Sequence, residues 1–298
     1  MPTVITGLAE AGRGRPVPVV SPLIEFGSAL HVLRDPGHHD RTGWAASTGA
    51  KMSRRLAEWT RAWWWTAQAI RAAPFVTAAQ LVTAAPPAAP PADDWEASLR
   101  RLRAMPASRL ASQLLRPVSR SGDVRAARHW AGSREPAVAA VVEGLALRPE
   151  KAAAGFVEFL ERSWQEWFSA EWAAIAPVLA ARARRFADTA AAQGASATLA
   201  TIDPSVTVTA TGSVSIAKVQ NARHDVSGRG LLVAPSSLIR PHLYVANVPG
   251  HPLLLIHPAE AGPSVPSAAD LLRRLDTVAH RGRLEVARAI ATEPRTAG

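Results

Sequence analysis

The sequence contains no cysteine among its 298 residues. Disulfide bonds, thiolate metal sites and cysteine nucleophiles are therefore excluded. Lysine is scarce, so the formal net charge of +10 comes almost entirely from arginine; the three lysines are Lys51, Lys151 and Lys218. This charge suits a polyanion partner such as nucleic acid, but it equally suits arginines scattered over solvated helix faces, because no dense basic run occurs.

Long apolar runs are also absent. No stretch approaches the ~20 apolar residues that a membrane-spanning helix needs. The only early apolar stretch is interrupted by Pro16, Pro18, Pro22 and Glu25, which is unlike a signal peptide. We therefore expect a cytoplasmic protein without a membrane partner.

The motifs of common enzymes are missing as well. The sequence has no G-x-S-x-G elbow, no H-E-x-x-H pair and no phosphate-binding glycine loop. The glycine-rich segment 227–230 leads from a turn into a strand, whereas a phosphate loop leads from a strand into a helix. We expect no enzyme, no catalytic residues and no cofactor.

Three histidines near the N-terminus raise the question of a metal site, since imidazoles are common zinc and iron ligands. They are His31, His38 and His39. No carboxylate lies at a recognisable ligand spacing, and the last two follow a Pro-Gly turn. The pattern favours solvent exposure or helix capping, as it does for His251 and His257, and no metal is predicted.

Helical periodicity dominates the first two thirds of the chain. Ser21 and Pro22 have the residue types of an N-cap and a first helical position. The first fifteen residues look weakly structured, and residues 84–92 form a proline-rich spacer. The pattern predicts helices over 21–33, 53–72, 95–105, from 106 or 108 to 116, 138–147 and 149–192, the last broken or kinked near Pro177.

From Ile202 the pattern changes to short strands. Residues 206–218 alternate branched and small polar residues around a turn at 211–213, and three apolar segments follow, each bounded by glycine or proline. We predict five strands in an antiparallel β-meander. The fold class is α+β: a mainly helical part over 20–195 carrying a small antiparallel β-meander over 202–258.

Aromatic side chains form two stripes along predicted helices, one within residues 59–65 and the other within residues 156–172. The i, i+3, i+4 and i+7 spacings favour packing. However, the three consecutive tryptophans Trp63, Trp64 and Trp65 cannot all point inward from one helix, because neighbouring residues lie about 100° apart around the helix axis. At least one should face a second surface, either a dimer partner or an apolar cavity. The candidate ligand-binding residues are Trp59, Trp63, Trp64, Trp164 and Trp167.

The C-terminal segment is again helical and follows a Gly/Pro/Ser linker at 261–266. Its last helix carries Leu284, Ala287 and Ile290 at helical spacing, and Thr296 is placed to cap a further helix. RGRLEVARAIATEPRTAG resembles the opening of the winged helix domain of ArsR-like bacterial transcriptional regulators. VVSPLIEFGSALHVLRDPGHH and VSGRGLLVAPSSLIRPHLYV are similar to a large N-terminal domain, of uncharacterised role, that precedes such winged helices.

The resemblance implies a dimeric DNA-binding regulator. Residues 1–266 would be its effector-binding and dimerisation domain, and 267–298 the start of a winged helix-turn-helix. DNA would bind through a region beyond Gly298, and the effector would be small and apolar or planar. The lack of cysteine excludes thiolate metal sensing. Candidate phosphate contacts are Arg281, Arg283, Arg295 and Thr296. The alternative is a ligand- or protein-binding module that does not bind DNA.

Overall fold

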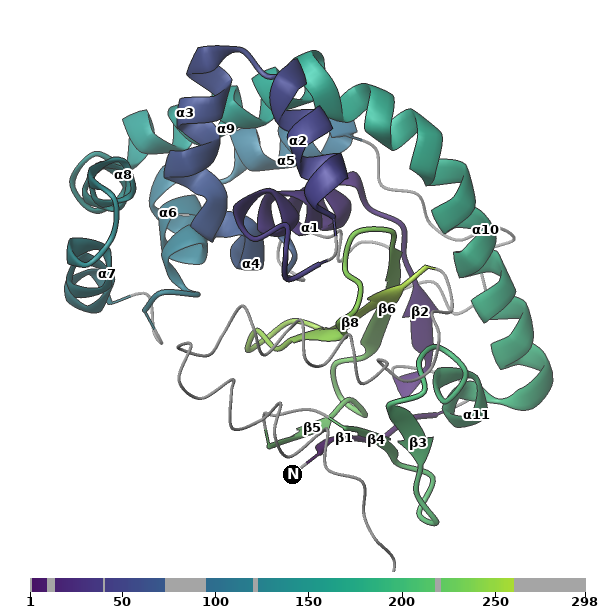
Figure 1. Cartoon of the computed structure of the whole chain (residues 1–298). Helices are drawn as coiled ribbons and strands as arrows, with labels where there is room; N and C mark the ends of the chain where they lie inside the picture. Colours follow the sequence, from purple (N-terminus) through teal and green to yellow (C-terminus); the bar gives the residue numbers. More distant parts are fainter. Residues whose placement is uncertain are drawn as a thin grey trace, which may run out of the picture. The chain divides into compact units, whose positions relative to one another are not determined.

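The computed structural model describes residues 2–9, 14–39, 41–72, 95–119, 123–217 and 221–259. All of them lie in one compact unit, Met1–Glu260. The fold is α+β, as the sequence predicts (Figure 1). The predicted spacer 84–92, the linker 261–266 and the helices of 267–298 lie outside the described residues. Within the described ranges, no helix is both long enough and apolar enough to cross a membrane.

Helix α1 (Pro22–Arg34) is the central element of the helical part. Ser21 is extended and Pro22 occupies the first helical turn, as predicted, although the Ser21 hydroxyl makes no capping hydrogen bond. Most of the helix is buried, because it contacts other helices along its length and strand β6 (Leu231–Ser236) as well. The helix therefore connects the aromatic core to the sheets.

The remaining helices of the first half share one hydrophobic core with α1. Helices α2 (Thr42–Lys51) and α7 (Val124–Gly132) were not predicted. The beginning of α3 (Arg54–Trp63) was predicted: Ser53 caps this helix by accepting a hydrogen bond from the Leu56 amide at 3.2 Å. The elements are α2 (Thr42–Lys51), α3 (Arg54–Trp63), the 3₁₀ turn η2 (Trp64–Thr66), α4 (Ala67–Ile70), α5 (Trp95–Ala104), α6 (Ala107–Leu115), α7 (Val124–Gly132) and α8 (Pro136–Leu147).

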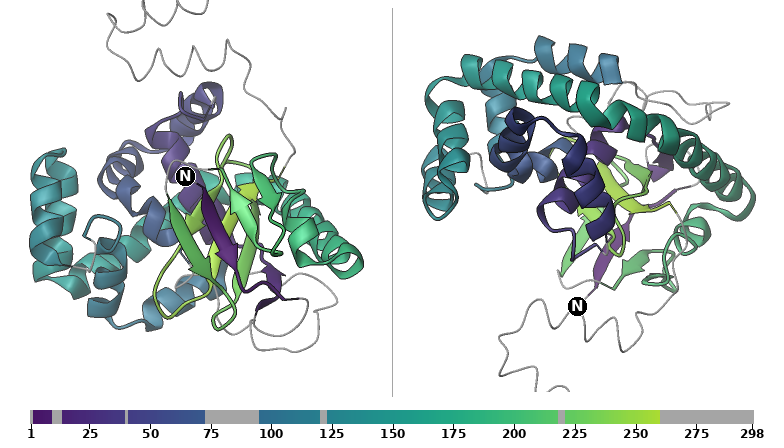
Figure 2. Two further views of the ribbon diagram at one scale, coloured as in Figure 1. Left: turned by 90° about the horizontal axis from the view of Figure 1, so that it is seen from below. Right: turned by 45° about the horizontal axis from the view of Figure 1, so that its top comes forward.

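A long helical stretch follows, close to the predicted 149–192. Helix α9 (Pro149–Ser163) continues through a π-helical turn, η5 (Trp164–Phe168), into α10 (Ser169–Gln193). Helix α10 contains Pro177 but is not broken there, and it ends at Gly194, whose φ of 88° is accessible to glycine. Figure 2 shows α10 alongside the strands, and it contacts β6. The short α11 (Ala195–Leu199) comes next.

The strands form two four-stranded sheets, so the predicted antiparallel meander is wrong. One sheet has the order β3-β4-β1-β5 and the other β2-β6-β8-β7. Each sheet contains parallel as well as antiparallel pairs. The strands are β1 (Thr3–Thr6), β2 (Pro16–Pro18), β3 (Val206–Val208), β4 (Val214–Ile216), β5 (Ala222–Asp225), β6 (Leu231–Ser236), β7 (Tyr244–Ala246) and β8 (Leu253–Pro258).

Burial explains the parallel pairing of the second sheet. Every residue of β6 and of β8 is buried, so both faces of these strands are covered. Such strands are continuous apolar runs and usually pair in parallel, whereas one-sided antiparallel strands alternate. Residues 3–6, predicted to be weakly structured, form a strand instead, because β1 pairs with both β4 and β5. Two pairs of consecutive strands, β3–β4 and β7–β8, have the predicted antiparallel form.

Candidate functional site

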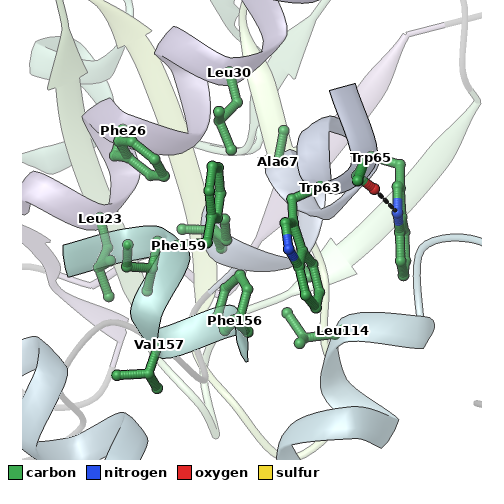
Figure 3. Close-up of a cluster of buried hydrophobic side chains, with 14 of the residues drawn as sticks. Leu23, Phe26, Leu30, Trp63, Trp65, Ala67, Leu114, Phe156, Val157 and Phe159 are labelled. Carbon is green, nitrogen blue, oxygen red and sulfur yellow. Dashed lines mark hydrogen bonds between the residues drawn. The ribbon is translucent and has the colours of Figure 1, made fainter. Parts of the chain in front are cut away.

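The predicted ligand-binding tryptophans lie on two neighbouring parts of the aromatic core. Trp63 is buried at the end of α3, and its ring stacks on Phe159 and contacts Phe156 (Figure 3). Trp65 is buried too, because the 3₁₀ turn changes the angular spacing after Trp63. Its ring contacts Trp130 of α7, so the second surface predicted for this run includes another helix of the same chain.

The other predicted tryptophans also have partners within the chain. Trp164 stacks on Trp95 with ring centroids 4.8 Å apart, and Trp167 stacks on Phe26. Trp59 and Trp64 are half-buried and lie beneath the guanidinium groups of Arg55 and Arg34. Packing and cation–π contacts thus involve all five rings.

A surface hollow lies elsewhere, on α7. None of the five predicted tryptophans lines it; its lining residues are Val118, Ala126, His129, Trp130, Gly132 and Ser133. The four residues predicted to contact DNA phosphates, Arg281, Arg283, Arg295 and Thr296, lie outside the described residues.

The strongest concentration of chemically active side chains is a cluster of four histidines, which we call the histidine cluster: His31, His38, His39 and His242. The ring centroids of His31 and His39 are 4.8 Å apart, and those of His38 and His242 are 4.3 Å apart in a stacked arrangement. One nitrogen from each of His38, His39 and His242 lies within 4.8 Å of the other two.

Two loops bring these rings together. His31 is in the last turn of α1, and the next segment turns sharply because the backbone amides of His39 and Arg41 donate to the Pro36 carbonyl. The Arg41 guanidinium donates to the Ser237 carbonyl at 3.2 Å, which ties this loop to the loop between β6 and β7. His242 comes from that second loop, about two hundred residues further along the chain.

The hydrogen bonds of His39 fix the proton positions in the cluster. Its Nδ1 lies 2.8 Å from the Arg240 carbonyl oxygen, which can only accept, so Nδ1 carries a proton. Burial lowers the pKa of His39, and its ring is therefore neutral, with a lone pair on Nε2. The Nδ1–H of His31 donates to this lone pair across 2.7 Å.

Burial changes across the cluster. His39 is only 3% exposed, His31 and His242 are half-buried and His38 is exposed. Burial, together with the charge of Arg71 and the neighbouring imidazoles, lowers the pKa of His31 to about 3. His31 and His39 are thus uncharged at neutral pH, and the cluster reaches solvent at His38.

Two buried ionisable side chains, Arg71 and Glu25, lie next to the histidine cluster. The Arg71 guanidinium is buried, donates to the Ala67 carbonyl and lies over the Tyr244 ring at 4.4 Å. The Glu25 carboxylate accepts from the Ser237 amide at 2.9 Å. Complete burial raises the pKa of Glu25 to about 7, with a smaller contribution from the charge of Glu171. Glu25 therefore links α1 to the loop between β6 and β7 through a buried polar contact.

The comparison with protein families returns one match over this part of the chain. A family model described as a family of unknown function (DUF5937) matches residues 3–263. The chain belongs to this DUF5937 family. No curated protein matches the chain, and neither does any solved structure. The match includes the two loops and all four rings of the histidine cluster, as well as the aromatic core.

The histidines of this DUF5937 chain differ from the sequence prediction. Exposure or helix capping was predicted for His31, His38 and His39. His38 is exposed as predicted, but His31 is half-buried, and His39 is buried and bonded to a carbonyl from the other loop. His257 is also buried, and burial lowers its pKa to about 4. The sequence contains no local signal for the cluster, because His242 reaches it only through the tertiary fold.

Proposed function

We propose that this DUF5937 chain is the regulatory part of a DNA-binding transcriptional regulator with an ArsR-like winged helix-turn-helix. The observation that carries the proposal is where the family match ends. It ends at residue 263, and the stretch that resembles the opening of a winged helix follows within 267–298. A compact module, Met1–Glu260, followed by a DNA-binding segment is the organisation that such a regulator requires.

The mechanism that fits this organisation is effector control of a dimer. Two winged helices in a homodimer bind two half-sites whose separation must match the separation of the two recognition helices. An effector that binds the first module and alters the dimer changes this separation and therefore the DNA affinity. The net charge of +10 favours approach to DNA.

A gel-shift experiment tests the proposal. The complete product of the gene is titrated against its own promoter region, with a variant that ends at residue 260 as the control. We expect the complete product to shift the promoter fragment and the shortened variant not to shift it. Absence of a shift with the complete product, or a stop codon directly after Gly298, would refute the proposal.

A binding module without DNA affinity is the second candidate. The observation that favours it is that the family match needs no residue beyond 263 and includes the whole histidine cluster. In that case the complete product would bind a ligand or a partner protein and would leave the promoter fragment unshifted at every protein concentration. The same gel-shift experiment therefore separates the two candidates.

A further inference from the structure

We propose that His38, His39 and His242 form a binding site for one divalent transition-metal ion such as Zn²⁺. One nitrogen of each side chain lies within 4.8 Å of the other two. Neutral imidazole nitrogens are good ligands for zinc and for its neighbours in the first transition series. The site goes beyond the proposed function, because it requires neither DNA nor a dimer.

The geometry requires only a small contraction. Zinc–nitrogen bonds of about 2.0–2.1 Å place the ligand nitrogens of a tetrahedral site roughly 3.3 Å apart. The present separations, at most 4.8 Å, must therefore shorten by no more than roughly 1.5 Å. His38 is exposed on a loop, so rotation of its ring can shorten its distances to the other two ligands without disturbing the core.

His39 already has the outer contact that metal-bound imidazoles make. A ligating histidine usually donates its second N–H to a carbonyl or a carboxylate, and this contact fixes the orientation of the ring. The Nδ1–H of His39 donates to the Arg240 carbonyl at 2.8 Å, so its Nε2 lone pair is the ligand atom. His39 thus supplies a fixed ligand at the buried end of the site.

His31 competes with the ion for that lone pair. Its Nδ1–H donates to Nε2 of His39 across 2.7 Å, and a metal ion bound to Nε2 would replace this hydrogen bond. Removing the donor without removing ring volume, as in His31→Phe, should therefore strengthen metal binding. The expected gain is roughly fivefold, which corresponds to one hydrogen bond of ordinary net strength.

The bound ion would join the two loops of the cluster. His38 and His39 follow α1, and His242 lies between β6 and β7, so the ion would cross-link the helical part to the second sheet. A ligand that binds only the folded chain raises the free energy of unfolding in proportion to the logarithm of its concentration. Three protein ligands leave a coordination position for water, and the exposed His38 provides access from solvent.

Calorimetric titration with metal alone tests the proposal. The full 298-residue chain, free of any affinity tag, is titrated with Zn²⁺, and Co²⁺ is used in parallel because its absorption spectrum reports the coordination geometry. We expect one ion per chain. His38→Ala and His242→Ala should each weaken binding by roughly tenfold or more. His129→Ala, in the exposed part of α7, is the matched control and should bind as the wild type does.

Two results would overturn the proposal. One is the absence of saturable binding at one ion per chain in the wild type. The other is wild-type affinity in both His38→Ala and His242→Ala, with far-UV circular dichroism showing that both variants are folded. His38 is exposed, so its replacement leaves the fold intact even if a His39 variant does not fold. The titration uses no DNA, and its failure is therefore distinct from a failure of the gel-shift experiment.

Discussion

Replacing Glu25 with glutamine should change the way in which stability depends on pH. Glu25 lies in the first turn of α1, is 1% exposed and accepts a hydrogen bond from the Ser237 amide. Burial raises its pKa from the ordinary 4.5 to about 7, although hydrogen bonds from the 236–238 loop partly oppose this shift. Glutamine has nearly the same shape and keeps an oxygen for the Ser237 amide, but it cannot ionise.

The direction in which the free energy of unfolding changes with pH follows from proton binding to Glu25 in the folded and the unfolded chain. Below pH 4.5 the Glu25 carboxyl is protonated in both the folded and the unfolded chain, so it adds no pH dependence there. Between pH 4.5 and about 7 the unfolded chain releases this proton while the folded chain keeps it. The free energy of unfolding therefore falls as the pH rises through this window. The rise of the Glu25 pKa from 4.5 to about 7 corresponds to about 3 kcal/mol of stability lost by pH 8.

Urea unfolding at pH 4.5, 6 and 8, followed by tryptophan fluorescence, measures this effect. The quantity of interest is the stability difference between variant and wild type, which should grow in favour of Glu25→Gln by about 3 kcal/mol from pH 4.5 to pH 8. The neighbouring charges of Arg71 and Glu171 are present in both proteins. Glu96→Gln, at an exposed position of α5, is the control and should give a constant difference. Parallel pH profiles for wild type and Glu25→Gln would refute the reasoning.

Three further predictions concern packing and capping, and urea unfolding checks each of them. Gly27→Ala should destabilise the chain by about 1–3 kcal/mol, since its Cβ would lie 2.9 Å from the Ala67 carbonyl oxygen, whereas Gly155→Ala has open space and should stabilise α9 by about 0.5–1 kcal/mol. Equal effects of the two glycine substitutions would contradict this account. Phe26→Ala should cost about 3–5 kcal/mol, because the fully buried ring contacts four aromatic side chains; a cost below 1 kcal/mol would be inconsistent with that packing. Ser53→Ala should cost about 1 kcal/mol through loss of the cap on α3, and an unchanged midpoint would show that the cap does not contribute.

Local signals predicted much of the helical part. Ser21 and Pro22 correctly indicated the beginning of α1, and Ser53 that of α3. The range predicted for the long helix, 149–192, agrees with α9 to α10 within a residue, because apolar periodicity continues through the π-helical turn. Helix α2 was not predicted, since its sequence TGWAASTGAK has little apolar periodicity and only Thr48 in it is buried.

The sheets and the histidine cluster depended on contacts distant in sequence. The apolar runs of β6 and β8 indicated strands, but sequence alone does not show that strands and helices cover both of their faces, and their parallel pairing was therefore not predicted. His39 is buried because Arg240 and His242 come from a loop two hundred residues away. A histidine beside a Pro-Gly turn gives no indication of such a partner. The stretch that resembles a winged helix lies outside the described ranges, and the resemblance to such regulators stays a prediction.

X-ray absorption at the zinc edge tests the metal site most directly, because it counts the imidazole ligands around the ion. The tag-free wild-type chain is loaded with one equivalent of Zn²⁺ and compared with His242→Ala. We predict three histidine ligands with zinc–nitrogen distances of about 2.0–2.1 Å in the wild type and two in the variant. One histidine ligand or none in the wild type, or the same number in both proteins, would contradict the assignment of His38, His39 and His242 as a metal centre.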